Sequence, residues 1–407
     1  MPLTISELRK AVASSAAAFR CVTEFQPAGG PGDKIFPPTY EGGRYAVEKR
    51  MVDERLVDCV LLDSVQSQAN RMELALLEAH RDRKIRLPLL ITHFDHESLL
   101  KKFTVTSLEA SHRIADALFR DCYLNGVIFR RSEKGSILDY TDIRNATGLF
   151  GICPTALLFG IWDSTGPRGG LGAKFQRAIV SEIIGYDAVM GVKTSSRIDK
   201  AEIRADVTIY EADTDVKYTP DPDRALKDKS GKPILYDRGR SERGKPGNPS
   251  KANHSNVVPT ISDGGFTISK AVQTVVLSLA ALRRLRFPLG QNLESDPEVD
   301  ITARTTLAAL GLAAVTLAQQ DLDLRSRCQL FPQHDPKWTL LDRPGQSHIE
   351  YELKPDAAVN LLNEAIDQAK KAGLPWEGEI ELTPSPELLE LVRRSQELAS
   401  SSDVEVE

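Results

Sequence analysis

Apolar positions in the first half of the chain follow two different periods. A run of strand length at 57–64 is followed by residues 65–82, in which apolar side chains recur at helical spacing. This order predicts a strand, a polar turn and a helix. Other apolar runs predict strands at PLLITHF and at 154–162, and mixed patterns predict helices within 107–124 and 140–151.

The chain loses its apolar density in the middle. Residues 175–192 read as a strand interrupted by Gly185 and Gly191, and 199–256 are then rich in Asp, Lys, Pro and Gly. Loops of this length inside a compact domain are usually functional or disordered. The most basic part, 224–251, has too little apolar surface to order itself, so we expect it to be flexible.

Regular structure is expected again after this loop. Apolar residues predict helices at 269–286, 302–320 and 359–373. No run of 18 apolar residues is present, and the N-terminal segment 5–19 contains Glu, Arg and Lys. The sequence therefore predicts neither a transmembrane helix nor a signal peptide, and no membrane partner.

The distribution of charge and cysteine narrows the classes of protein further. The net charge of −5 comes largely from the acidic stretch 340–407, which leaves the rest of the chain basic enough to face a polyanion. The five cysteines lie far apart in mostly apolar surroundings. This argues against a disulfide framework and predicts a protein of the reducing cytoplasm.

The predicted strand-to-helix turn at 63–72 is the richest candidate site. A helix N-terminus carries free N–H groups and a partial positive charge, which suit a phosphate. Uncharged donors there can contact RNA without reading its sequence. The alternative is an ordinary helix cap with a solvated polar face. The side chains concerned are Ser64, Gln66, Ser67, Gln68, Asn70 and Arg71.

A glycine-rich loop at 166–172 is the second candidate. It is no Walker A loop. That motif needs Lys and then Ser or Thr directly after its last glycine, whereas here Ala173 follows the last glycine and Phe175 follows the lysine. Glycines can bring the backbone close to a ribose-phosphate chain, and a tight bulged turn is the alternative. Its candidate contacts are Arg168, Gly169, Gly170, Lys174 and Arg177.

Catalytic and metal-binding patterns are weak. His93 and His96 have no third ligand cluster nearby in the sequence, and no G-x-S-x-G nucleophile elbow is present. Asp33 lies beside glycines, where aspartate usually forms turns. The sequence therefore predicts no catalytic residue, no metal and no cofactor.

Four longer stretches together resemble one known family. They are FPPTYEGGRYAVEKR, VDCVLLDSVQSQANRMELALLEA, RNATGLFGICPTALLFGIWDSTGPRGGLGAKFQRAIVSEIIG and FTISKAVQTVVLSLAALRRLRFP. Over about residues 30–330 the chain is similar to the RAMP-superfamily backbone subunit, of the Cas-seven type, of type I-U (I-G) CRISPR effector complexes.

The resemblance implies an α+β fold: an RRM-like (RAMP) palm with an antiparallel sheet, a helical finger-like insertion and a β-hairpin thumb. The expected parts are 1–189 as the first part of the palm with the insertion at about 83–150, 190–257 as the thumb with a basic tip at 224–251, 258–350 as a helical second part of the palm, and 351–407 as a C-terminal helix and acidic tail.

The resemblance also implies a function without catalysis. Copies of the subunit would polymerise along one crRNA and present it for pairing with target DNA. Its further partners would be the large subunit, the guide-end-capping and processing subunit, and a recruited helicase-nuclease. The start of the thumb would add Ser196 and Arg197 to the two candidate sites as a third RNA-binding zone.

Two alternatives stay open. One is a target-cleaving RAMP nuclease that uses Asp33, and the other is a general single-stranded RNA-binding module. RRM sheets that stack bases carry a strand with interleaved aromatic residues, and no such strand is visible here. The expected grip is therefore mainly on the RNA backbone.

Overall fold

The structure is a computed structural model that describes residues 1–166, 172–237, 245–254, 256–290, 294–342, 344–345 and 348–404. The chain divides into two compact units. The first comprises Met1–Asp95, Lys102–Val189 and Phe266–Leu388, and the second His96–Lys101, Met190–Gly265 and Leu389–Glu407. The fold is mixed α+β and its largest sheet is antiparallel, as the sequence predicts.

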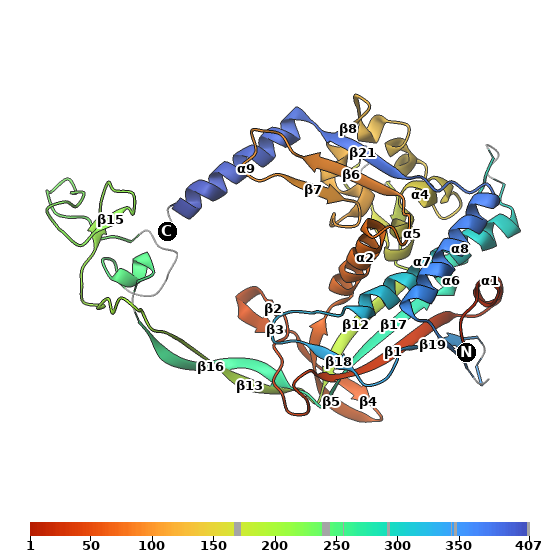
Figure 1. The fold of residues 1–407 in the computed structure, drawn as a ribbon, viewed down its shortest axis with the longest axis horizontal. Helices are drawn as coiled ribbons and strands as arrows, with labels where there is room; N and C mark the ends of the chain where they lie inside the picture. Colours follow the sequence, from red (N-terminus) through yellow and green to blue (C-terminus); the bar gives the residue numbers. More distant parts are fainter. Residues whose placement is uncertain are drawn as a thin grey trace. The chain divides into compact units, whose positions relative to one another are not determined.

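The first unit is built on an eight-stranded sheet (Figure 1). The order is β20-β19-β1-β17-β12-β5-β4, with β18 also paired to β1. The strands are β1 (Ala18–Pro27), β4 (Val47–Val52), β5 (Arg55–Asp63), β12 (Ile179–Tyr186), β17 (Lys270–Ser278), β18 (Leu330–Pro332), β19 (Lys337–Leu341) and β20 (Ile349–Glu352).

Strand β17 corrects the sequence analysis. We expected a helix at 269–286, but Lys270–Ser278 is a strand between β1 and β12, and only the short α6 (Leu279–Leu282) is helical. Alternate residues from Ala271 to Leu277 are buried. The apolar run is compatible with either a buried strand or a buried helix, and its β-branched residues favour the strand.

The reverse error occurs at 154–162, where we expected a strand. Pro154–Phe159 forms the short helix α5, and only Ile161–Trp162 is a strand, β10, paired with β11 (Lys174–Phe175). All six residues of α5 are buried, so no amphipathic period marks it as a helix. Proline at its first position suits a helix start, since the missing N–H has no partner there.

The helices expected at 107–124 and 140–151 are mostly absent. The first stretch contains the 3-10 turn η2 (Arg113–Ala115), α3 (Ala117–Arg120) and the strand β8 (Cys122–Leu124). In the second, only the last part is helical, as the short α4 (Thr147–Ile152). Asp116 is the N-cap of α3 and accepts from the N–H of Leu118 at 3.0 Å, so a helix begins only there.

The four longest helices that lie wholly in the first unit are α1 (Ile5–Ala13), α2 (Val65–Arg81), α7 (Pro297–Gln320) and α8 (Pro355–Lys371). The helices predicted at 65–82, 302–320 and 359–373 are thereby confirmed. By length and composition α7 could cross a membrane, but its apolar window is 83% buried within the protein, as in the core helix of a globular fold. It contacts α1, α2 and α8 and runs beside the sheet (Figure 1).

A second, five-stranded sheet has the order β7-β6-β21-β8-β9. It includes the strand predicted at PLLITHF. Its strands are β6 (Leu89–Phe94), β7 (Phe103–Thr106), β8, β9 (Val127–Ile128) and β21 (Glu379–Pro384). One short antiparallel pair, β2 (Thr39–Tyr40) with β3 (Arg44–Tyr45), completes the strands of this unit.

The second unit contains little buried apolar surface. Its main element is the antiparallel pair of β13 (Val189–Arg197) and β16 (Val257–Thr267). Beyond this pair, β14 (Tyr210–Glu211) and β15 (Tyr218–Thr219) border a small cluster around Ile209 and Tyr236. The helix α9 (Pro386–Val404) contributes Gln396, which exchanges two hydrogen bonds with the backbone of Lys101.

Candidate functional site

The helix α2 begins directly after the buried strand β5. Ser64 is its N-cap, with φ −79° and ψ 164°, and its hydroxyl accepts from the N–H of Ser67 at 3.2 Å. The capping interpretation of this serine is therefore realised in the structure. Because α2 has 3.6 residues per turn, its polar residues are divided between a side that faces the core and a side that faces solvent.

Gln68 and Arg71 lie on the inward side. Gln68 is 2% exposed, and its amide donates to the buried carboxylate of Asp63 at 2.6 Å. The guanidinium of Arg71 donates to the same carboxylate oxygen at 3.0 Å, and to the carbonyls of Asp323 and Leu324 at 2.5 and 2.7 Å. The polar atoms of these two side chains already have partners within the fold, so the proposed RNA interface does not include them.

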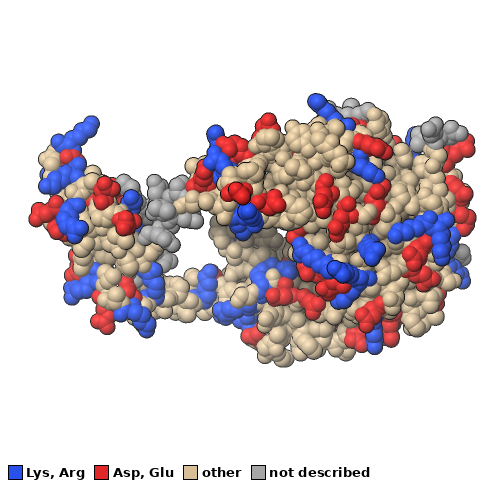
Figure 2. All heavy atoms as spheres, turned by 45° about the horizontal axis from the view of Figure 1, so that its top comes forward, with Lys and Arg blue, Asp and Glu red and all other residues tan. Residues whose placement is uncertain are grey.

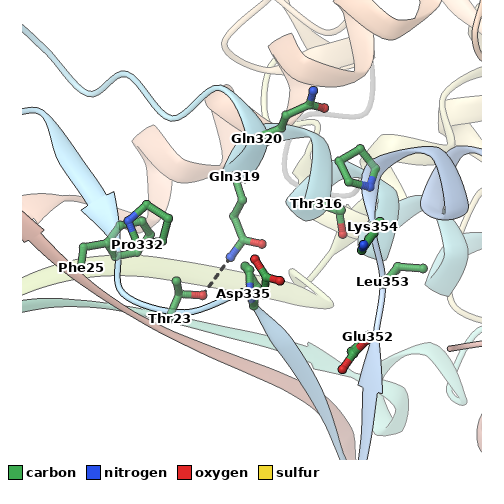
Figure 3. Close-up of a pocket in the computed structure, with 12 residues that line it drawn as sticks. Thr23, Phe25, Thr316, Gln319, Gln320, Pro332, Asp335, Glu352, Leu353 and Lys354 are labelled. Carbon is green, nitrogen blue, oxygen red and sulfur yellow. Dashed lines mark hydrogen bonds between the residues drawn. The ribbon is translucent and has the colours of Figure 1, made fainter. Parts of the chain in front are cut away.

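A chain of polar side chains continues from Gln68 through the core. Its carbonyl oxygen accepts from Ser181 of β12 at 2.8 Å and from Gln273 of β17 at 2.7 Å. Gln319 of α7 donates to Gln273 at 2.8 Å and to Thr23 of β1 at 3.2 Å (Figure 3). We call the set Asp63, Gln68, Ser181, Gln273, Gln319 and Thr23 the buried network. It fixes the rotation of α2 and α7 on the sheet, since a buried polar group without a partner is costly.

The buried network ends at a cavity of about 330 Å³. Gln319 and Thr23 line it, and Asp335, Glu352 and Lys354 are among its other lining residues (Figure 3). Sequence reasoning gave no sign of this cavity, because its lining comes from segments more than 300 residues apart in the chain.

The outward side of α2 faces a different environment. Gln66 and Asn70 are exposed. Gln66 also lines a hollow of about 800 Å³, together with residues 111–117 and the β10–β11 hairpin. We call this hollow the Trp162 groove. Its polar and aromatic lining residues are Gln66, Ser111, His112, Arg113, Asp116, Phe159, Trp162, Ser164, Thr165, Lys174, Phe175, Gln176 and Arg177.

Trp162 and Lys174 face each other across the hairpin. They are paired residues of β10 and β11, and the Lys174 ammonium lies 5.0 Å from the centroid of the Trp162 ring. Trp162 is 58% exposed, although tryptophan is usually highly buried. Arg177 follows in the same groove and is exposed as well. The groove thus offers one open aromatic ring and two cations.

The floor of the groove carries two opposite charges that form an ion pair. Arg113 binds Glu73 of α2 through two hydrogen bonds of 2.6 and 2.8 Å, and donates to the carbonyl of Gly160 at 3.0 Å. Burial raises the pKa of Glu73, and the charge of Arg113 opposes this rise. Gly160 has a φ of 86°, and a Cβ there would lie 3.1 Å from the Arg177 nitrogen. The floor therefore holds the backbone that presents Arg177.

The glycine loop is fixed at both ends by Asp163. This buried carboxylate accepts from Arg130 at 2.8 Å, and burial raises its pKa. A Cβ on Gly166 would lie 2.4 Å from the Asp163 carboxylate, and one on Gly172 would lie 2.4 Å from the Asp163 carbonyl oxygen. The close approach requires glycine at both positions. The predicted contacts Arg168, Gly169 and Gly170 lie outside the described residues.

The structure brings together only some of the predicted site residues. Gln66, Lys174 and Arg177, from two of the three predicted zones, line one groove. Ser196 and Arg197 lie exposed on β13 in the second compact unit. Trp162 was not predicted as a contact, because the base-stacking surfaces of RRM sheets carry a strand with several aromatic residues. A lone tryptophan between an apolar run and the polar segment Asp163–Gly166 was the available signal.

The weaker catalytic candidates have ordinary partners. Asp33 accepts from the backbone N–H of Lys34 at 2.9 Å, and His93 and His96 bond to Thr104 and Ser98 at 2.9 and 2.8 Å. In the described part of the chain, no group of three His, Cys, Asp or Glu residues is placed to hold a metal ion. All five cysteines are buried free thiols.

Charge is not segregated on the face of the molecule drawn in Figure 2, where Lys and Arg are interspersed with Asp and Glu. A binding surface for a polyanion would therefore depend on local groups of cations rather than on one broad basic face. The pair Lys174 and Arg177 is one such local group.

Comparison with known proteins gives one informative match. Residues 19–190 match the family model described as CRISPR-associated protein GSU0053. No curated protein sequence matches the chain. Among solved structures, the crystal structure of Thermofilum pendens Csc2 aligns with 98% of this chain and 92% of that chain at 12% identity, but with a TM-score of 0.23. So low a score carries no argument about the fold. Over residues 19–190 the chain is thus similar to a CRISPR-associated family, in agreement with the resemblance found in the sequence.

Proposed function

We propose that the chain is a crRNA-binding backbone subunit of a type I CRISPR effector complex, with no catalysis of its own. One observation carries the proposal. On a chain matched to a CRISPR-associated family, residues predicted to contact RNA from two distant segments line the same open groove. Gln66 comes from the start of α2, and Lys174 and Arg177 come from the hairpin and the residues after it.

The chemistry of the groove suits a guide of any sequence. Two cations can neutralise successive phosphates, and amide and hydroxyl groups can bond to ribose or phosphate oxygens. Neither kind of contact distinguishes one base from another. A subunit that holds the guide must accept every spacer, and base pairing then reads the target.

The remaining parts of the proposal follow the resemblance. The large sheet would be the palm, residues 83–150 the finger-like insertion, and the β13–β16 pair within 190–257 the thumb, with Ser196 and Arg197 near its start. Copies of the subunit would assemble along the guide in the cytoplasm, present it to target DNA, and bind the large subunit and the guide-end-capping subunit. The recruited helicase-nuclease would supply the cleavage.

The test removes the two cations of the groove. For single strands the slope of log affinity against log salt is about −0.7 per neutralised phosphate. Lys174→Ala with Arg177→Ala should therefore reduce the slope by about 1.4 and weaken guide binding. The matched control is Lys370→Ala with Lys371→Ala. These exposed lysines at the end of α8 carry the same charge and are not part of the groove.

Two outcomes would contradict the proposal. A slope that falls equally in both double variants would mean that general charge, not the groove, binds the RNA. Random cellular fragments in place of repeat-derived guides, among the RNA that copurifies with the wild-type protein, would favour a general RNA-binding module.

A further inference from the structure

Trp162 has no evident role in holding the fold. Of the three tryptophans, Trp338 is 1% exposed in the core, and Trp376 donates its indole N–H to the carbonyl of Arg86 at 2.8 Å and packs on Phe150. Trp162 alone among the three is a large exposed ring, on a two-residue strand at the edge of a groove. Leaving so much aromatic surface in water forgoes the stabilisation that burial would give.

The surroundings of the ring define what can cover it. An apolar helix or strand would need an exposed apolar rim, but the large apolar side chains that line the groove, Phe159, Ile161 and Phe175, are buried. The exposed lining residues besides Trp162 include His112, Lys174, Gln176 and Arg177. A flat group with polar edges, attached to negative charge, fits better. The ring would take the flat group, and the two cations would take the charge.

We propose that Trp162 is a stacking platform for an unpaired base of the bound RNA, with Lys174 and Arg177 on the flanking phosphates. This rests on the proposed function and adds a base contact to a grip that the sequence predicted to involve mainly the backbone. The volume of about 800 Å³ lies within the range of about 300–1,000 Å³ that is usual for small-molecule sites.

Stacking is compatible with a guide of variable sequence. Every base has a π-face, so an aromatic platform holds bases with little preference among them. Besides its charged residues, the groove is lined by amides, hydroxyls and an imidazole, from Gln66, Gln176, Ser111, Ser164, Thr165 and His112. The platform would take one base out of the stacked guide without selecting which base it is.

The position of Lys174 is part of the arrangement. Its ammonium lies 5.0 Å from the centre of the ring in the absence of RNA, which is within cation–π distance. The lysine is thereby held beside the platform. A base on the exposed area of the ring would bring its phosphates close to this ammonium, so the aromatic and charged contacts would form together.

The experiment compares Trp162→Ala and Trp162→Phe on two RNAs of equal length, one with bases and one with an abasic backbone. Trp162→Ala should weaken binding of the base-containing RNA by about fivefold or more, which corresponds to one lost stacked base. It should change the salt slope little and leave the abasic RNA nearly unaffected. Trp162→Phe should restore most of the affinity. Quenching of tryptophan fluorescence by the base-containing RNA should disappear in both variants.

The outcomes separate this inference from the proposed function. If the Lys174 and Arg177 variants lose guide binding while Trp162→Ala binds both RNAs normally, the groove holds RNA but the platform is wrong. If Trp162→Ala weakens both RNAs equally, the ring acts only by positioning Lys174, and the platform is again wrong. If none of these variants affects guide binding, both the platform and the proposed interface fail. An unchanged melting temperature of Trp162→Ala shows that its fold is intact.

Discussion

The two sides of α2 have nearly the same composition and opposite environments. Gln68 and Arg71, on the inward side, have every polar group directed to a partner in the fold. Gln66 and Asn70, on the outward side, are exposed, and Gln66 borders the Trp162 groove. The comparison shows that a polar helix start is not one site. Its residues separate into a scaffold and a surface according to the helical period.

The scaffold side also explains how the surface side is placed. Asp63, at the end of β5, joins Gln68 and Arg71 to the sheet and lies 3.5 Å from the guanidinium of Arg325. Because these contacts fix the rotation of α2, they set the direction in which Gln66 points. Changes on the two sides should therefore affect different quantities, stability on one and RNA binding on the other.

The largest effect should come from Asp63→Ala. The side chain of Asp63 is fully buried, so its loss leaves Arg71 and Arg325 without their carboxylate. Breaking a buried ion pair typically lowers the free energy of unfolding by about 3–5 kcal/mol. Urea denaturation measures this. The control is Asp58→Ala on the same strand, where an exposed pair with Lys49 should be worth less than about 1 kcal/mol.

Equal losses of stability in these two variants would contradict the assignment of Asp63 as the anchor of the inward side.

Arg71→Ala should have the next largest effect. It removes hydrogen bonds to a carboxylate and to two carbonyls, and hydrogen bonds to charged groups contribute about 1.5–3 kcal/mol to the free energy of unfolding. Because the guanidinium is used within the fold, the salt dependence of guide binding should stay as in the wild type. Titrations at several salt concentrations check this, and a flatter slope would place Arg71 at the RNA after all.

The smallest effects should come from a matched pair two residues apart. Gln68→Ala removes the acceptor of Ser181 and Gln273 and a donor to Asp63, and should lower the free energy of unfolding by about 1–3 kcal/mol, with little change in guide affinity. Gln66→Ala should leave stability unchanged and weaken guide binding by about two- to tenfold, as for one lost hydrogen bond. Thermal melting and binding titrations on both variants test the division, and a reversed result would refute it.

The sequence was sufficient where a local pattern decides the structure. The run before Ser64 and the helical spacing after it predicted β5 and α2, because a buried strand and an amphipathic helix differ in period. It was insufficient for β17 and α5, which are covered on all sides. There the choice between strand and helix depends on partners elsewhere in the chain, such as β1 and β12 for β17.

The candidate site was predictable in part for the same reason. The residue types at the start of α2 and around the glycine loop were evident from the sequence, and Gln66, Lys174 and Arg177 do share a groove. Which face of α2 turns inward was not evident, because Ser181 and Gln273 lie 113 and 205 residues from Gln68. No local pattern contains that information.

The place of β17 in the sheet has a consequence for the synthesis of the protein. Phe19 of β1 pairs with Leu277, so the strand emerges from the ribosome long after both of its neighbours. At about 5–20 residues per second, the delay after β1 is on the order of 10–50 seconds. Until β17 is made, β1 exposes an unpaired edge that can recruit other chains, and β12 exposes another from the time of its own synthesis. A nascent chain of this kind requires protection from aggregation, and a fragment cut to residues 19–190 would keep both edges exposed permanently.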